Sequence, residues 1–340
     1  MPSRISKKSN EKNKTKSKKT NPGKKSKTTS NTTQKLMKVN CNPSLTPMKI
    51  HKGKTCFRKK DMFRLRNEFN KTFPQYAIDT NADDPTEIFD LLRLRMNDHK
   101  GCKREDCWLQ VIADPMERNH LMKELYRPLQ PSSWNENPTK WLTNHDMEKV
   151  LKQYEEKYPN FKLIGPTTID FDKNHSYLGG CVEDVMCTFD YSTYVKENPS
   201  IDKLGIIINY DVHTGNGTHW VALFMDLKEK LIVFFDSQSG YSKTLKPEIQ
   251  KFINKVKSQE PGFIDVINKK THQSTTTECG MYVLHFLITM LIPTEHCRRK
   301  LKDKESVYDA RIKYFTQNRI PDKDMIYLRN AYFNKNIDIL

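Results

Sequence analysis

Apolar residues in the second half of the chain gather in short runs that predict β-strands. The runs are rich in β-branched and aromatic residues and end at turn-forming positions; they span 162–165, 204–210, 219–225, 231–235 and 263–267. Two helices are expected beside these strands. One has Pro247 in its first turn and apolar residues at helical spacing, and the other, 280–292, is apolar on nearly every face and is therefore expected to be buried.

The first half of the chain has the apolar spacing of helices instead. An Asp-Pro dipeptide at 84–85 and another at 114–115 each precede such a segment, in the order of a capping residue followed by a first-turn proline. Asn144 is the expected N-cap of a third helix, 146–157. The whole pattern predicts an α+β protein in four parts: a tail at 1–40, a linker at 41–60, a helical region at 61–130 and a core at 131–340.

Positive charge is concentrated at the start of the sequence. Residues 1–40 hold thirteen Lys or Arg and one acid, so this tail carries +12 of the formal net charge of +17. The tail has few large apolar residues and cannot bury enough surface to offset the entropy of ordering, so we expect it to be disordered. It is expected to bind nucleic acid, an acidic surface or a nuclear import receptor, with a purely solubilising role as the alternative.

The eight cysteines show no repeated framework. The first forty residues contain no apolar stretch that could serve as a secretory signal, and the longest apolar run, 281–292, is too short to span a bilayer. We therefore expect no membrane segment, and reduced thiols in a reducing compartment. The pair Cys102 and Cys107 is a weak zinc pattern, and packing of Cys107 with Trp108 in the helical region is the preferred interpretation.

One cysteine occupies a position suited to nucleophilic chemistry. Cys279 follows a polar stretch, 275–278, and directly precedes the buried apolar helix, so its thiol is expected at a helix N-terminus. Free backbone N–H groups and the helix dipole stabilise a thiolate at such a place. The small Gly280 would let a substrate backbone approach closely. On this feature alone, inert packing of a buried cysteine is the simpler alternative.

A histidine and an aspartate are expected to face each other across a hairpin. His219 begins one predicted strand, and Asp236 directly follows the next. If Asp226 pairs with Leu231, side-chain alternation puts His219 and Asp236 on the same face as diagonal neighbours. The carboxylate would then orient the imidazole and raise its basicity, which prepares it to activate a thiol.

Gln273 lies in the loop after the last predicted strand, six residues before Cys279. A side-chain amide there can donate to an oxyanion together with the Cys279 backbone N–H. Trp220 is expected to wall the substrate cleft, with strand packing as an equal alternative. His272 is a rival base, and His285 is expected to be an ordinary core histidine. This chemistry requires no metal and no organic cofactor.

These residues follow one another in a characteristic order along the chain: His219-Trp220, Asp236, Gln273, Cys279-Gly280. The order resembles the signature of the superfamily of SUMO (ubiquitin-like-protein) proteases and adenovirus proteases. Papain-like enzymes place the cysteine before the histidine, so the chain does not resemble them. The resemblance implies a cysteine protease that acts on protein or peptide substrates, with a core in which helices flank a central mixed sheet.

Upstream segments resemble a narrower group, the thiol proteases of giant viruses, to which the polyprotein protease of African swine fever virus is related. The likeness covers about residues 85–340 and rests on the segments 102–108, 131–134, 141–146, 153–157 and 161–172. It implies cleavage of virion precursor proteins after Gly-Gly-type sequences, in the virion and in the virus factory of the host cytoplasm. The chain's own Gly179-Gly180 is interpreted as a tight turn.

Three other functions are alternatives to endopeptidase activity. A deconjugating isopeptidase for a ubiquitin-like modifier would use the same four side chains. A noncatalytic virion protein that binds nucleic acid through its tail would be expected to lack at least one of them, and none is lacking. An acetyltransferase built on the same thiol would react with acetyl-CoA and leave peptides uncut.

Overall fold

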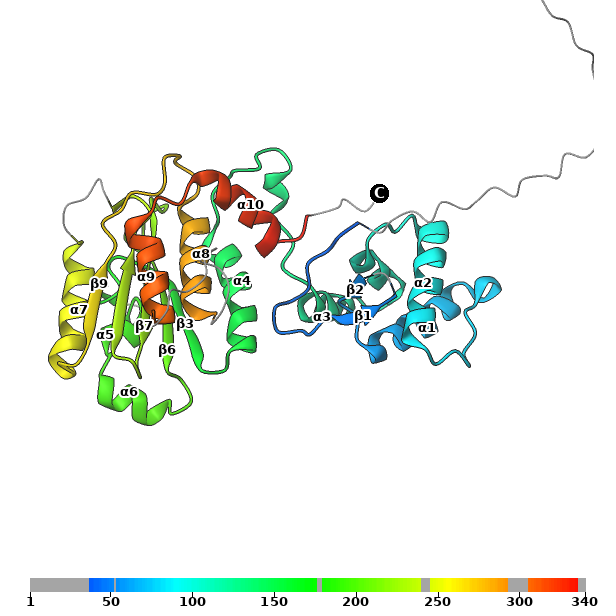
Figure 1. Ribbon diagram of the computed structural model, residues 1–340, viewed down its shortest axis with the longest axis horizontal. Coiled ribbons are helices and arrows are strands. Elements are labelled where there is room, and N and C mark those ends of the chain that lie inside the picture. Colours follow the sequence, from blue (N-terminus) through cyan, green and yellow to red (C-terminus); the bar gives the residue numbers. More distant parts are fainter. Residues whose placement is uncertain (1–36, 52, 176–178, 240–244, 293–304, 336–340) are drawn as a thin grey trace, which may run out of the picture. The chain divides into compact units, whose positions relative to one another are not determined.

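The computed structural model describes residues 37–335, apart from 52, 176–178, 240–244 and 293–304 (Figure 1). The predictions for the basic tail concern residues that lie almost wholly outside these ranges. Among the described helices, none combines the length and the apolar character needed to cross a bilayer.

A five-stranded mixed sheet organises the second half of the chain. Its strands lie in the order β3 (Phe161–Thr168), β6 (Lys203–Asn209), β7 (Trp220–Asp226), β8 (Leu231–Phe235) and β9 (Ile264–Ile267). The two outer pairs are parallel and the two inner pairs are antiparallel. Every predicted run forms one of these strands, although β3 is longer than expected. The α+β class and the mixed sheet are therefore confirmed.

Side-chain alternation sends neighbouring residues of the sheet into two separate cores. In β7, Ala222 and Phe224 pack in one core, whereas Val221 and Leu223 pack in the other. Figure 1 shows helices on both sides of the sheet. The first core is closed by α4 (Asn144–Lys157), α8 (Cys279–Leu291), α9 (Val307–Gln317) and α10 (Asp322–Tyr332), and the second by α5 (Asp184–Cys187), α6 (Tyr191–Glu197) and α7 (Pro247–Gln259).

The hairpin between β7 and β8 has the predicted register. Asp226 pairs with Leu231 and Ala222 pairs with Phe235, so Asp236 leaves the strand just beyond the last ladder pair. Strand β7 begins at Trp220, one residue later than expected, although the His219 carbonyl still accepts a hydrogen bond from Tyr210 N at 2.9 Å. His219 therefore continues the line of the strand.

Helix starts follow local capping chemistry. Two predicted helices begin where expected: α2 (Pro85–Lys100) and α3 (Pro115–Leu125). Their N-caps, Asp84 and Asp114, each accept a backbone N–H through the side chain. The N-cap expected at Asn144 is wrong, because Thr143 caps α4. The Thr143 hydroxyl accepts from Asp146 N, and the Asp146 carboxylate accepts from Thr143 N, a reciprocal capping box.

The helical region has a hydrophobic core of its own. Its centre is Trp108, which is fully buried and lies 5.6 Å from the ring of Phe57 and 5.0 Å from that of Phe89. Packing of Trp108, the preferred interpretation of this segment, is confirmed. The predicted bounds of the helical region, 61–130, stay a prediction. The remaining elements are β1 (Met48–Ile50), β2 (Gly53–Thr55), α1 (Lys59–Thr72), η1 (Pro74–Tyr76), η2 (Glu105–Val111), η3 (Ser132–Trp134), β4 (Asn174–His175) and β5 (Gly180–Cys181).

Six cysteines form disulfides, so the prediction of reduced thiols is wrong for them. The pairs are Cys41–Cys56, Cys102–Cys107 and Cys181–Cys187, with Cα–Cα distances of 5.3, 5.6 and 6.2 Å. These distances lie within the span that a disulfide bridges. The spacing of the cysteines along the sequence does not predict these disulfides, because the fold determines which cysteines lie close together. The disulfide between Cys102 and Cys107 also contradicts the weak zinc pattern, because these two sulfurs are bonded to each other.

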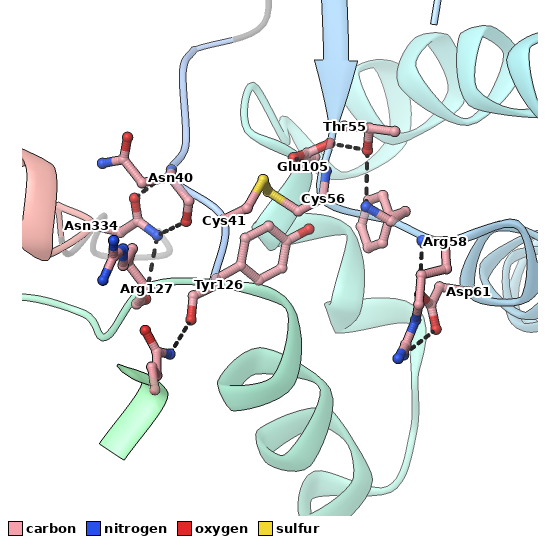
Figure 2. Close-up of a disulfide and its surroundings, with 12 residues drawn as sticks. Asn40, Cys41, Thr55, Cys56, Arg58, Asp61, Glu105, Tyr126, Arg127 and Asn334 are labelled. Atoms are coloured by element: carbon pink, nitrogen blue, oxygen red, sulfur yellow. Dashed lines mark hydrogen bonds and ion pairs between the residues drawn. A yellow bond between two sulfur atoms is a disulfide. The ribbon is translucent and has the colours of Figure 1, made fainter. Parts of the chain in front are cut away.

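Figure 2 shows the first of these bridges and its surroundings. It joins Cys41 to the residue that follows β2. The Cys56 N–H donates to Glu105 at 3.1 Å, and burial raises the pKa of that carboxyl to about 7. The neighbouring Asn40 exchanges hydrogen bonds with Asn334, at 2.7 Å from its N–H and 2.8 Å to its carbonyl. The bridge therefore fixes a segment that also holds residues near the end of α10.

Candidate active site

Cys279 is the first residue of α8, as predicted, and is 2% exposed. It carries the one thiol in the described part of the chain that is not in a disulfide. The first N–H groups of the helix have no partners within it, and they surround the thiol with partial positive charge. The position therefore suits a nucleophilic sulfur.

Gly280 has a different role from the predicted one. It is buried, and an added methyl group would lie 3.0 Å from Leu142 Cβ and 3.3 Å from Met147 Sδ. The absent side chain thus lets α8 pack closely against α4 and the segment before it. The expectation that Gly280 makes room for a substrate backbone is wrong, since core side chains take that space.

His219 interacts with both of the partners predicted for it. Its Nε2 lies 2.7 Å from Asp236 Oδ1, and Cys279 also stabilises the charged imidazole. Burial works to lower the pKa of the imidazole, but the interactions with Asp236 and Cys279 outweigh it and raise the pKa to about 9. A protonated imidazole beside a thiol favours the thiolate.

Asp236 is held by three donors. Its Oδ1 accepts from Gln238 N at 2.8 Å as well as from His219, and its Oδ2 accepts from the Tyr210 hydroxyl at 3.0 Å. Burial and the neighbouring carboxylate raise the pKa of Tyr210, which therefore stays a protonated donor. Tyr210 was not among the residues predicted from the sequence. Pairing β6 with β7 would have found it, because Tyr210 lies opposite His219 in the extended register.

Gln273 is buried and lies beside the residue that follows Asp236. Its Oε1 accepts from the Ser237 hydroxyl at 2.7 Å, and its Nε2 donates to Thr275 O at 2.7 Å. One hydrogen of the amide nitrogen remains for another acceptor, as an oxyanion donor requires.

The loop between Gln273 and Cys279 is anchored by α10. The Asp322 carboxylate accepts from Ser274 N at 3.1 Å, from Thr275 N at 3.2 Å and from the Tyr282 hydroxyl at 3.0 Å. Asp322 is nearly buried, so these bonds are made with little competition from water. Asp322 was not predicted from the sequence either, because no local pattern indicates a contact between residues 47 positions apart.

A buried ion pair adjoins the nucleophile. Glu278 Oε2 lies 3.0 Å from Arg329, and both side chains are at most 4% exposed. The guanidinium also lies 4.2 Å from the ring centre of Trp134 and donates to Lys140 O at 3.0 Å. The pair therefore ties the residue before Cys279 to the segment that precedes α4. It was not predicted from the sequence.

The other singled-out residues fall outside this constellation. His272 is fully buried, donates through Nε2 to Phe315 O and accepts from Ile320 N, and burial lowers its pKa to about 4. It is therefore a structural group rather than a base. His285 lies in the core and contacts the Tyr314 hydroxyl at 3.0 Å, as expected. Trp220 is half-buried and packs against the first core, and its role in a cleft stays a prediction.

Residues 190–337 match the model of the Ulp1 protease family, C-terminal catalytic domain. The segment is similar to the catalytic domain of this family of cysteine proteases. It contains all four predicted tetrad positions. A thiol protease of Acanthamoeba polyphaga mimivirus is 31% identical over 157 residues, which are 45% of this chain and 48% of that protein. The chain thus matches about half of that relative's length.

A protein of African swine fever virus matches a larger share of this chain. A SUMO-1 cysteine protease of its Pretoriuskop isolate is 25% identical over 261 residues, 71% of this chain and 86% of that protein. The crystal structure of the African swine fever virus protease superposes with a TM-score of 0.56 at 19% identity, covering 87% of this chain and 96% of that one. The fold and the resemblance to viral thiol proteases are both confirmed.

Proposed function

We propose that the protein is a cysteine endopeptidase that cleaves precursor proteins of a virus particle after Gly-Gly-type sequences. Cys279 is the nucleophile and His219 the base, with Asp236 orienting the histidine and Gln273 donating to the oxyanion. The observation that carries the proposal is the position of His219, whose ring hydrogen-bonds to Asp236 at 2.7 Å and interacts with Cys279.

The reaction follows from this arrangement as acyl transfer. The Cys279 thiolate attacks the scissile carbonyl carbon, and the negative charge that develops on oxygen is received by Gln273 and the Cys279 backbone N–H. Protonated His219 gives its proton to the leaving amine as the C–N bond breaks. A water molecule, deprotonated by His219, then attacks the thioester, releases the carboxylic acid and restores the thiol.

The limited exposure of the Cys279 sulfur supports a preference for substrates that have small residues near the scissile bond. Cys279 is 2% exposed and Trp220 is half-buried next to the histidine, so bulky side chains near the scissile bond would have to displace packed groups. Glycine brings only backbone to such a site. The viral origin of the relatives supports virion precursors as substrates, with the virion and the virus factory as the place of action.

Deconjugation of a ubiquitin-like modifier is the second candidate, because one relative is named a SUMO-1 cysteine protease. The same four side chains would cut an isopeptide bond. Release of free modifier from a conjugate would favour this function, and cutting of a linear Gly-Gly-containing precursor would favour the first.

The deciding experiment compares the purified protein with Cys279→Ser on a Gly-Gly-X peptide library and on a modifier conjugate. The variant keeps the size and the hydrogen-bonding group of the side chain but lacks a nucleophile that His219 can ionise. We expect cleavage by the wild type and none by the variant. Equal cleavage by both would remove Cys279 from the mechanism and the proposal with it.

The basic tail, residues 1–40, is proposed to hold the enzyme on nucleic acid or another acidic surface. Its charge of +12 would release condensed counterions from DNA, so binding should weaken steeply as salt rises. A version without the tail should lose retention on DNA and keep peptide cleavage. Retention that is independent of the tail would contradict this role.

A further inference from the structure

Ser237 links the two halves of the candidate site. It directly follows Asp236, and its hydroxyl donates to Gln273 Oε1 at 2.7 Å. Its backbone carbonyl accepts from His272 N at 2.8 Å and from Gln273 N at 3.0 Å. Ser237 and Gln273 are each 1% exposed, so water does not replace these bonds.

The surrounding acceptors determine which way the Gln273 amide points. Thr275 O can only accept, so the amide group 2.7 Å from it must be Nε2. Oε1 then faces Ser237, whose hydroxyl is the donor. If this hydroxyl were absent, Oε1 would be a buried acceptor without its partner, and rotation of the amide would no longer be opposed on that side. A rotated amide would present oxygen where the oxyanion requires N–H.

We propose that Ser237 is a positioning residue that fixes the Gln273 amide for oxyanion binding. The inference rests on the proposed function of Gln273. Two consecutive residues would then have complementary positioning roles: Asp236 orients the base, and Ser237 orients the oxyanion donor. Asn268 Nδ2 donates to Asp236 O at 2.9 Å and fixes the peptide between them.

The test is a double-mutant cycle with Ser237→Ala and Gln273→Ala. Ser237→Ala is expected to lower kcat about tenfold with KM unchanged, the loss of one neutral hydrogen bond. Gln273→Ala is expected to lower kcat about a hundredfold. Because Ser237 acts through Gln273, the double variant should be no slower than Gln273→Ala alone.

Further readouts separate positioning from general damage. The pH dependence of kcat/KM should be the same in Ser237→Ala as in the wild type, because the His219 ion pair is untouched. Affinity for a peptide aldehyde, which forms a tetrahedral adduct on the thiol, should fall by the same factor as kcat. Ser237→Cys keeps the volume with a weak donor, so it should fold normally and still lose activity.

Ser239→Ala is the matched control. Ser239 lies in the same loop, is 8% exposed, and its hydroxyl bonds only to Lys270 O at 3.3 Å among its described side-chain partners. We expect wild-type activity from it. Full activity of Ser237→Ala, or a double variant that loses the product of both single effects, would overturn the positioning role. Full activity of Gln273→Ala would instead remove the oxyanion role itself, and with it the inference.

Discussion

Replacing Asp236 by asparagine removes a charge from the site with little change in shape. The new Oδ1 can still accept from His219 Nε2 and from Gln238 N, which lie 2.7 and 2.8 Å from it. The new NH₂ group would face the Tyr210 hydroxyl, which can turn to accept. The variant therefore separates the electrostatic effect of the carboxylate from its role in holding the imidazole.

The size of the effect follows from the geometry. Two unit charges about 4 Å apart interact by about 4 kcal/mol at an effective dielectric constant of about 20. Since one pKa unit corresponds to about 1.4 kcal/mol, loss of the charge is expected to lower the His219 pKa by about 2 to 3 units. In the wild type that pKa is about 9, so the variant should titrate near the ordinary value of 6.5 or below it.

The assay is the pH dependence of kcat/KM between about pH 5 and 10. Activity requires thiolate beside a protonated imidazole, so the alkaline limb reports loss of the His219 proton. We expect this limb near pH 9 in the wild type and about 2 to 3 units lower in Asp236→Asn. An alkaline limb that stays at the same pH in the variant would refute the assignment of Asp236 as the charge partner.

The raised pKa of His219 also makes the stability of the folded protein depend on pH. The His219 pKa is higher in the folded protein than its ordinary value of 6.5, so the folded state binds the extra proton. The contribution to stability is fully present below about pH 6.5 and is lost as the pH rises through about 9. Urea unfolding at the two ends of this window should show the loss in the wild type and little of it in Asp236→Asn.

Two further predictions concern stability around the nucleophile. Glu278→Gln leaves the buried Arg329 without its counter-charge and should cost about 3–5 kcal/mol in urea unfolding, with part of the loss recovered by Arg329→Met in the same chain; an unchanged midpoint would contradict the pairing. Gly280→Ala places a methyl group 3.0 Å from Leu142 Cβ and should cost about 1–3 kcal/mol in urea unfolding. If Gly280→Ala left the free energy of unfolding unchanged, α8 would have to be able to move away from Leu142.

Local rules in the sequence predicted much of the fold. The pairing of Asp226 with Leu231 followed from strand periodicity and a short turn, and it placed His219 and Asp236 together correctly. Aspartate followed by proline marked two helix starts, because capping is decided within a few residues. The cysteine at the start of α8 was likewise visible as a change from polar to apolar sequence.

Contacts between distant segments could not be predicted in this way. Tyr210 reaches Asp236 through the register of β6 on β7, and the buried Asp322 reaches the loop before Cys279 from another helix. Gly280 looked like a substrate contact because the facing residue, Leu142, lies more than a hundred positions away. Disulfide pairing depends on proximity for the same reason.

The anchoring of the loop before Cys279 by α10 has a consequence for the order of assembly. The nucleophile and its oxyanion donor are translated well before Asp322 and Arg329, the groups that hold the intervening loop in place. A nascent chain that has emerged only as far as α8 would therefore possess the thiol and the imidazole without a settled loop between Gln273 and Cys279. Proteolytic competence should therefore arise only once α10 has joined the fold.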